Sequence, residues 1–292
     1  MQKQKKSLYI LTGIIIFLGM IVTLTGLLYT NGGVAYDFIN QYGDTVKIYG
    51  NGLYANDSIL MASGYRGTDF TVLVLVIPML IVALIMDIKK KTMKSRLFLT
   101  SVISVFTYYS ASMAIGVTYN ILHMAYIAFF SVSLFGLIIA ISSMDRELLK
   151  SGVTGKLPYK GFIIFLALSG IALILAWIPD IILSLVKGSS LATIEVYTTS
   201  ITNVIDMGII GPVALIGLYQ LKKRSGMAYI LLGMLLTLCA VIGAMLPMQT
   251  VFQIAAGIEV PVPVLITKVA SFVILALFAL YFDICLFRAI KK

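Results

Sequence analysis

The chain has 292 residues, of which 60% are hydrophobic and only 12% charged, and its mean hydropathy is +1.03. A soluble domain needs more polar surface than this composition supplies, which excludes a soluble fold. The net charge of +10 comes from lysines and arginines that lie between apolar runs, so it indicates contact with a lipid bilayer and its anionic headgroups and argues against nucleic acid as a partner.

Eight apolar segments are long enough to cross a bilayer as helices. Spanning about 30 Å of hydrocarbon takes about 20 helical residues, and a helix satisfies its own backbone hydrogen bonds. The sequence therefore predicts an all-α polytopic bundle of about eight transmembrane helices, forming a single integral membrane domain over residues 1–292. The predicted windows are Leu8–Thr30, Phe70–Ile88, Leu97–Thr118, Ile121–Met144, Gly161–Leu183, Ile201–Gln220, Gly226–Met248 and Val262–Arg288.

Positive charge alternates between the connections. Of the 22 lysines and arginines, 18 lie in the two tails and in the second, fourth and sixth connections. Cationic segments resist translocation, so these regions are predicted to be cytoplasmic. The expected location is the cytoplasmic membrane of a bacterium, with both termini inside the cell.

Residues 31–69 form the largest connection and are predicted to be external. This loop is rich in Gly, Asn, Asp and Tyr, and we expect it to lie over the outer helix ends. Thr45–Tyr49 and Leu53–Tyr54, on either side of Gly50-Asn51-Gly52, predict two short strands around a glycine turn.

Prolines at membrane depth predict two bent helices. Pro78 and Pro212 each remove one backbone hydrogen bond. Bent helices often surround cavities, although packing alone also explains them. No inverted repeat relates the two halves of the sequence.

Few ionisable residues lie within predicted spans, where charge is costly and each such group is a functional candidate, and three of them lie toward the outer side. Asp180, Asp206 and Lys268 are each predicted about 6–10 Å below the outer boundary, on three different helices. A lysine between two aspartates would neutralise the site, and Asn203 would extend the polar network.

Polar residues of the third and fourth windows reach the same level, among them Tyr108, Tyr119, Asn120 and His123. Together these residues predict an outward-facing polar pocket for a small solute. The structural alternative is that Asp180 lies in water beyond an interfacial Trp177, that Asp206 stabilises its helix N-terminus, and that Lys268 extends outward to the interface.

Enzymatic chemistry finds little support in the sequence. His123 is the only histidine, which excludes a multi-histidine metal centre, and no nucleotide-binding or nucleophile-elbow motif appears. Asp206 lacks the Gly-x-Gly-Asp signature of intramembrane aspartyl proteases. Catalytic residues, metals and cofactors are therefore not expected. Asp87 and Asp283 are expected to form solvated pairs at the cytoplasmic boundary.

The middle two thirds of the chain contain the stretches Gly52-Leu53-Tyr54, Asp57-Ser58, Arg66-Gly67-Thr68-Asp69, Pro78, Tyr119-Asn120, Ile205-Asp206-Met207-Gly208 and Pro212. These stretches resemble a family of uncharacterised bacterial multi-pass membrane proteins, to which we attach no activity. The resemblance implies a topology and no mechanism.

The preferred functional prediction is recognition or transport of a small solute from the outer face. The alternative is a non-catalytic membrane subunit whose external loop and basic connections dock a partner protein. A membrane-embedded enzyme ranks third.

Overall fold

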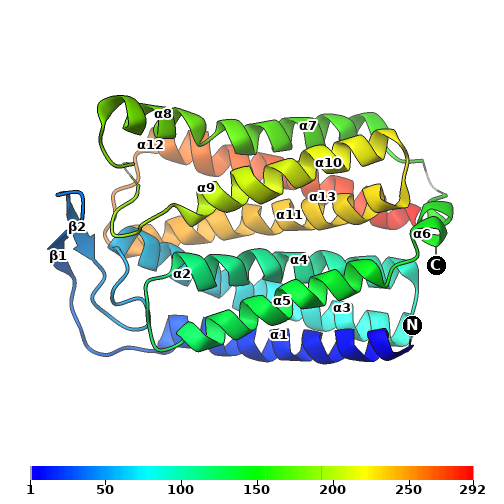
Figure 1. The fold of residues 1–292 in the computed structure, drawn as a ribbon, viewed down its shortest axis with the longest axis horizontal. Coiled ribbons are helices and arrows are strands. Elements are labelled where there is room, and N and C mark those ends of the chain that lie inside the picture. Colours follow the sequence, from blue (N-terminus) through cyan, green and yellow to red (C-terminus); the bar gives the residue numbers. More distant parts are fainter. Residues whose placement is uncertain (1, 155, 192, 292) are drawn as a thin grey trace.

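The computed structural model describes residues 2–154, 156–191 and 193–291, and in this part of the chain most regular structure is helical (Figure 1). Eight of its helical spans are long and apolar enough to cross a membrane, which confirms the predicted all-α bundle of a multi-pass membrane protein. The helices are, in chain order, α1 (Gln2–Leu28), α2 (Ile59–Thr71), η1 (Val72–Val76), α3 (Ile77–Lys90), α4 (Met93–Gly116), α5 (His123–Ser142), α6 (Arg146–Gly152), α7 (Tyr159–Leu175), α8 (Ile178–Lys187), α9 (Ile201–Ile205), η2 (Asp206–Ile210), α10 (Gly211–Lys222), α11 (Gly226–Ala255), α12 (Val262–Val264), η3 (Leu265–Ala270) and α13 (Ser271–Ala289).

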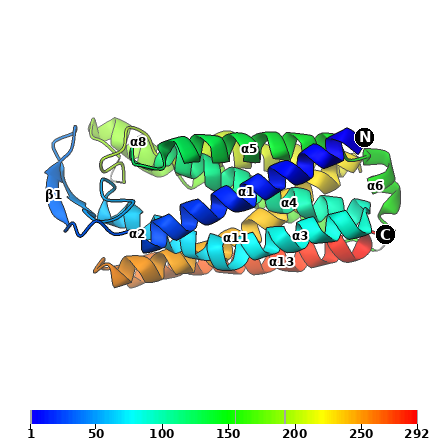
Figure 2. The ribbon, with the colours of Figure 1, turned by 90° about the horizontal axis from the view of Figure 1, so that it is seen from below.

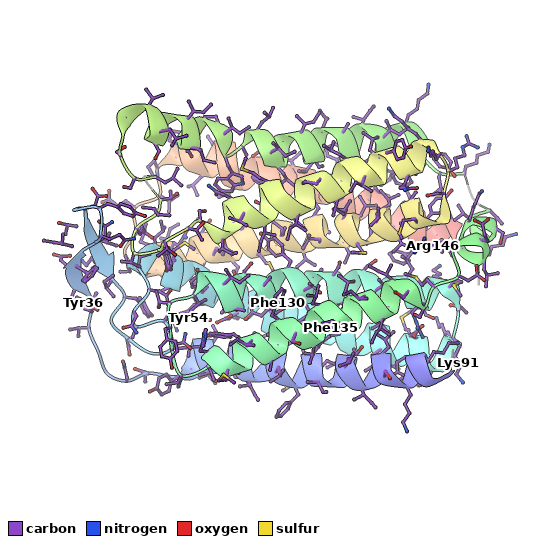
Figure 3. The ribbon with its side chains drawn as sticks, in the orientation of Figure 1. Tyr36, Tyr54, Lys91, Phe130, Phe135 and Arg146 are labelled. Carbon is purple, nitrogen blue, oxygen red and sulfur yellow. The ribbon has the colours of Figure 1, made fainter. Side chains whose placement is uncertain are left out.

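The two ends of the bundle differ. Both termini lie at one end, here called the terminal end, and a two-stranded sheet lies at the other, the hairpin end (Figures 1 and 2). Figure 3 shows Tyr36 at the hairpin end and Lys91 and Arg146 at the terminal end. Both ends of the chain therefore lie on the same side of the bundle, as eight crossings require.

The second span begins at Ile59 rather than at the predicted Phe70. Its first turns are polar, which hid them from a hydropathy window, yet they are buried inside the bundle. Ser58 caps the helix by accepting a hydrogen bond from the Met61 N–H (3.2 Å), and the Gln249 amide donates to the Thr68 hydroxyl (2.7 Å). The connection between the first two spans is therefore shorter than residues 31–69.

A hairpin forms in this loop, but it is not the predicted one: the predicted strand at Thr45–Tyr49 exists, whereas its turn and its partner strand are different. Strand β2 (Thr45–Ile48) pairs antiparallel with β1 (Tyr36–Ile39), whereas Leu53 and Tyr54 form a turn and are buried in the core. The turn forms at residues 40–44 because the Asn40 side chain accepts from the Tyr42 and Asp44 N–H groups. Such side-chain turns compete well with glycine turns.

Two connections interlock at the hairpin end, and we call them the cap: residues 29–58 together with 188–191 and 193–200. The Asn40 amide donates to the Glu195 carbonyl (2.7 Å), the Ser58 hydroxyl donates to the Glu195 carboxylate, and the Tyr197 hydroxyl donates to Asp57 (2.8 Å). The cap covers helix ends of both halves of the chain, as expected for the external loop.

The second four spans repeat features of the first four in the same order and direction. In each half a π-helical turn, Val72–Val76 or Asp206–Ile210, ends two residues before a proline, Pro78 or Pro212. The next span of each half is capped by a hydroxyl side chain: Thr92 caps α4 and Ser225 caps α11. Four crossings return the chain to its starting side, so the two halves have the same orientation and the repeat is parallel. It is therefore not the inverted repeat whose absence the sequence indicates.

Positions in the two halves can therefore be matched. Residue numbers differ by 134 in the second and sixth spans and by 133 in the third and seventh. A side-chain contact supports the match: Arg96 donates to Tyr9 (3.4 Å), and its equivalent Tyr229 bonds Tyr159 (2.8 Å) at the start of the fifth span.

Candidate functional site

Three adjoining cavities run from the hairpin end into the bundle. The mouth cavity has a volume of about 370 Å³ and includes the exposed cap residues Thr193 and Thr199 in its wall. A middle cavity of about 270 Å³ and an inner chamber of about 220 Å³ follow. Trp177, Thr202 and Leu246 line all three cavities, so the three form one row.

The inner chamber is largely apolar. It lies among the helices of the second half, with one wall from α4 of the first half. Its lining consists of Tyr108, Phe165, Leu166, Ser169, Leu173, Trp177, Thr202, Asp206, Ile210, Ala214, Leu235, Leu238, Cys239, Ile242, Leu246, Val269, Phe272 and Leu275. Among the residues described, Asp206 is the one charged side chain in the chamber wall.

Asp206 is held by two neutral donors. The Trp177 indole N–H lies 3.3 Å from one carboxylate oxygen, and the Tyr108 hydroxyl lies 3.5 Å from the other. The Asp206 side chain is 7% exposed, and within the described part of the chain no lysine or arginine pairs with it. A buried carboxylate with only long, neutral hydrogen bonds is costly in a membrane, which marks it as a functional candidate.

The local backbone explains how Asp206 reaches the chamber. It is the first residue of the π-helical turn η2, and its carbonyl accepts from the Gly211 N–H. Because Pro212 lacks an N–H, the helix is already interrupted at this level. Single π-helical turns of this kind occur often at functional sites.

Small side chains open the chamber where the first half is filled. Phe106 and Leu80 are fully buried in the core of the first half, and Phe106 packs edge-on against Phe129. The equivalent residues of the second half are Cys239 and Ala214, both of which line the chamber. The first half has the same arrangement of four spans, and large side chains fill it at these positions. The chamber therefore results from the small side chains of the second half and not from the arrangement of the spans.

A second polar group faces the chamber from α7. The Ser169 hydroxyl has no hydrogen-bond partner among the described residues, although the residue is only 9% exposed. Its neighbour Gly170 lets α7 approach α10 closely, because a Cβ there would lie 3.2 Å from the Gly211 carbonyl oxygen. The approach brings Trp177, two turns further along, to Asp206.

The predicted site residues do not all converge. Tyr108 and Asp206 meet in the chamber, but Asp180 is exposed in the first turn of α8 and has no described partner there. The side chain of Lys268 lies outside the described residues, so its proximity to Asp206 stays a prediction. Asn203 is buried and accepts from the Ser200 hydroxyl without lining a cavity.

The remaining three predicted residues gather away from the cavities, before the start of α5. Tyr119 is 78% exposed and its ring lies 5.1 Å from that of His123. The Asn120 side chain accepts from the Leu122 N–H and donates to the Tyr126 hydroxyl (3.4 Å). These contacts shape a turn between spans.

Sequence reasoning missed Trp177 as part of the site. The structural alternative placed Trp177 at the membrane interface. The Trp177 residue instead lines the mouth cavity, the middle cavity and the inner chamber, and its indole N–H bonds Asp206. The available signal was spacing: Ser169, Leu173 and Trp177 recur every four residues and therefore share one helix face.

Outside the cap, three further buried aspartates were predicted to lie in loops or at boundaries. Asp69 is fully buried and accepts short hydrogen bonds from the Tyr54 (2.6 Å) and Tyr109 (2.5 Å) hydroxyls. Asp283 is 9% exposed and accepts from the Thr237 hydroxyl (3.1 Å). Neither lines the three cavities.

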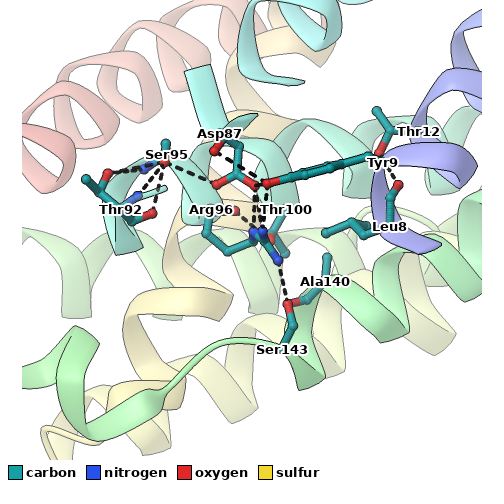
Figure 4. Close-up of polar contacts among 10 residues, drawn as sticks. All are labelled: Leu8, Tyr9, Thr12, Asp87, Thr92, Ser95, Arg96, Thr100, Ala140 and Ser143. Atoms are coloured by element: carbon teal, nitrogen blue, oxygen red, sulfur yellow. Dashed lines mark hydrogen bonds and ion pairs between the residues drawn. The ribbon is translucent and has the colours of Figure 1, made fainter. Parts of the chain in front are cut away.

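The third, Asp87, forms a buried ion pair with Arg96 (2.7 Å) near the terminal end (Figure 4). The prediction of pairing is confirmed and that of solvation is wrong, since the two side chains are 1% and 6% exposed. Tyr9 and Ser95 donate to the carboxylate (3.1 Å each), and Arg96 donates to Ser143 (2.9 Å). The network therefore joins the first four spans to one another.

Carboxylates of the cap are perturbed as well. Burial raises the pKa of Asp57 to about 6, although hydrogen bonds from the Thr118 N–H and the Tyr197 hydroxyl lower it. Burial also raises the pKa of Glu195, opposed by its bond from Ser58. The pKa values of both cap carboxylates are therefore above their ordinary values, and that of Asp57 lies at about 6.

Comparisons with protein-family models, curated proteins and solved structures give no match to this chain. The function must therefore be inferred from the chemistry of the row of cavities itself.

Proposed function

We propose that this protein binds a small solute in the inner chamber, reached through the mouth and middle cavities, as a recognition or transport protein of the bacterial cytoplasmic membrane. The observation that carries the proposal is Asp206, a buried carboxylate at the apolar end of a row of cavities. A buried carboxylate that has no cationic partner among the described residues, at the end of such a row, is typical of a binding site.

The charge distribution supports placing the mouth outside the cell. The basic connections lie at the terminal end, as Lys91 and Arg146 show, and the cavities lie toward the hairpin end. A solute would then reach Asp206 from the external side, past neutral polar groups such as Gln249 and Gln253.

The test compares two buried carboxylates. Purified wild-type protein is screened for thermal stabilisation by ammonium, carboxylate and neutral solutes of similar size. Asp206→Asn is expected to lose the stabilisation that the wild type shows, whereas Asp283→Asn, whose carboxylate lies outside the chamber, keeps it. Equal responses of the two variants, or no response of the wild type to any solute, would contradict the proposal.

A second function, docking of a partner protein, is favoured by the sheet. All four side chains of β1 are exposed, including the large apolar Phe38 and Ile39. Recovery of a stoichiometric partner that Phe38→Ser releases would support this role, and a partner-free protein after mild purification would oppose it.

A further inference from the structure

The inference concerns the chemical class of the solute and rests on the proposed function. We propose that the inner chamber takes a hydrophobic ammonium compound, with its cationic nitrogen at Asp206 and a hydrogen-bonding group at its other end near Ser169. The argument uses the charge of the walls, the nature of the chamber surface and the spacing of its polar groups.

The walls of the whole row are selective for positive charge. The chain carries a net charge of +10, yet no lysine or arginine lines any of the three cavities among the residues described. Among the described residues that line the three cavities, Asp206 in the inner chamber is the one charged residue. An anion would meet the buried Asp206 carboxylate, which has no cationic partner among the described residues, in a medium of low dielectric constant. Anionic solutes are therefore disfavoured and cations favoured.

The chamber surface suits an organic cation better than a metal ion. Magnesium and calcium need about six or more oxygen ligands, and the chamber offers one carboxylate and scattered hydroxyls among apolar side chains. An ammonium group with apolar substituents loses less hydration and gains about 25 cal/mol for each Å² of apolar surface that it buries. Four aromatic residues, Tyr108, Phe165, Trp177 and Phe272, add rings that attract such cations.

The two polar groups set a length. Ser169 and Trp177 lie eight residues apart on one face of the same span, which corresponds to about 12 Å along the helix. Trp177 bonds Asp206, so the carboxylate and the unpartnered Ser169 hydroxyl belong to two different levels of the chamber wall. A solute that fills the chamber therefore satisfies both groups if it carries polar ends on an apolar body.

The single tryptophan makes the test direct. Trp177 is the only tryptophan in the chain, and it lines the chamber. Intrinsic fluorescence excited at 295 nm or above therefore comes from this one residue. With the purified protein in detergent micelles, which add no tryptophan, 4-bromobenzyl-trimethylammonium is titrated as a heavy-atom quencher, against its neutral carbon isostere 1-bromo-4-neopentylbenzene. We expect saturable quenching by the cation at concentrations roughly tenfold or more below those of the neutral compound.

Two variants assign the effect. Asp206→Asn is expected to abolish the preference for the cation while leaving quenching by the neutral compound. Cys239→Phe, which places the first half's residue in the chamber, is expected to abolish saturable quenching by both compounds; Ile242→Phe serves in the same way if that variant is unstable.

The outcomes separate the two proposals. Equal quenching by both compounds, sensitive to Cys239→Phe, overturns the ammonium assignment and leaves the binding chamber intact. Preference for the cation that persists in Asp206→Asn also overturns it. Absence of saturable quenching by either compound counts against both this assignment and the chamber as a binding site.

Discussion

At the scale of single residues, Asp69 joins elements that are far apart in the chain. Its carboxylate accepts hydrogen bonds from the cap residue Tyr54 and from Tyr109 on α4, and Gly26 of α1 packs against it. A Cβ on Gly26 would lie 1.9 Å from a carboxylate oxygen. The glycine is therefore required by the aspartate.

Gly26→Ala is expected to lower the free energy of unfolding by about 2–5 kcal/mol, because the added methyl displaces Asp69 from its two donors. The control is Gly13→Ala in the same helix, where a Cβ would meet nothing within 4 Å. It should change stability by at most about 1 kcal/mol, toward greater stability. Thermal unfolding in detergent measures both, and similar behaviour of the two variants would exclude the packing argument.

Arg96→Met is expected to destabilise the protein by about 3–5 kcal/mol, since it leaves Asp87 charged, buried and without its cation. The double variant Asp87→Leu/Arg96→Tyr carries the residues of the equivalent positions, Leu221 and Tyr229. It should recover most of that loss, as measured by the unfolding midpoint. If the double variant were no more stable than Arg96→Met, the loss in the single variant would not come from leaving the Asp87 charge buried without its cation.

At the scale of elements, the cap is the part whose stability depends on acidity. The pKa of Asp57 is about 6 in the folded protein against an ordinary 3.8, so the folded state holds this proton more tightly. Stability from this group is therefore present in full below about pH 4 and is lost as pH rises to about 6. The loss amounts to at most about 3 kcal/mol, and Glu195 acts in the same direction.

The prediction is that the unfolding midpoint falls between pH 4 and 6.5, and that Asp57→Asn removes most of this slope. Asp44→Asn, which changes an exposed carboxylate of the same cap, should keep it. If the wild type and Asp57→Asn show parallel pH profiles, Asp57 does not carry the dependence.

Sequence alone predicts the spans because hydropathy is a property of whole helices. It does not predict the first turns of α2, since Arg66 and Asp69 are polar in sequence and satisfied only by partners on other elements. The same holds for the site. The depths of Asp206 and Tyr108 along their helices predict that they meet, whereas Asp180 at a similar predicted depth is exposed on α8, a helix with no buried residue. Depth follows from counting residues, but helix rotation depends on packing.

At the scale of the whole molecule, the charge of the terminal end predicts its orientation. In a Cys239→Ser/Cys285→Ser background, Asp37→Cys on β1 should react with a membrane-impermeant maleimide on intact cells. Ser151→Cys on α6 should react only after the membrane is permeabilised. The reverse pattern would place the cavity mouth inside the cell and remove the proposed route to Asp206.

The linker between the two halves gives the repeat a practical consequence. Each half begins and finishes on the same side, so a break in the backbone after Thr154 would leave two fragments, each with an intact set of four crossings. The Thr154 N–H donates to the Ala289 carbonyl (3.1 Å), and the Lys291 N–H donates to that of Gly152 (2.9 Å). The new C-terminus of the first fragment thus stays bonded to the C-terminal residues of the second fragment, and two genes encoding the fragments separately are expected to rebuild the full protein by complementation.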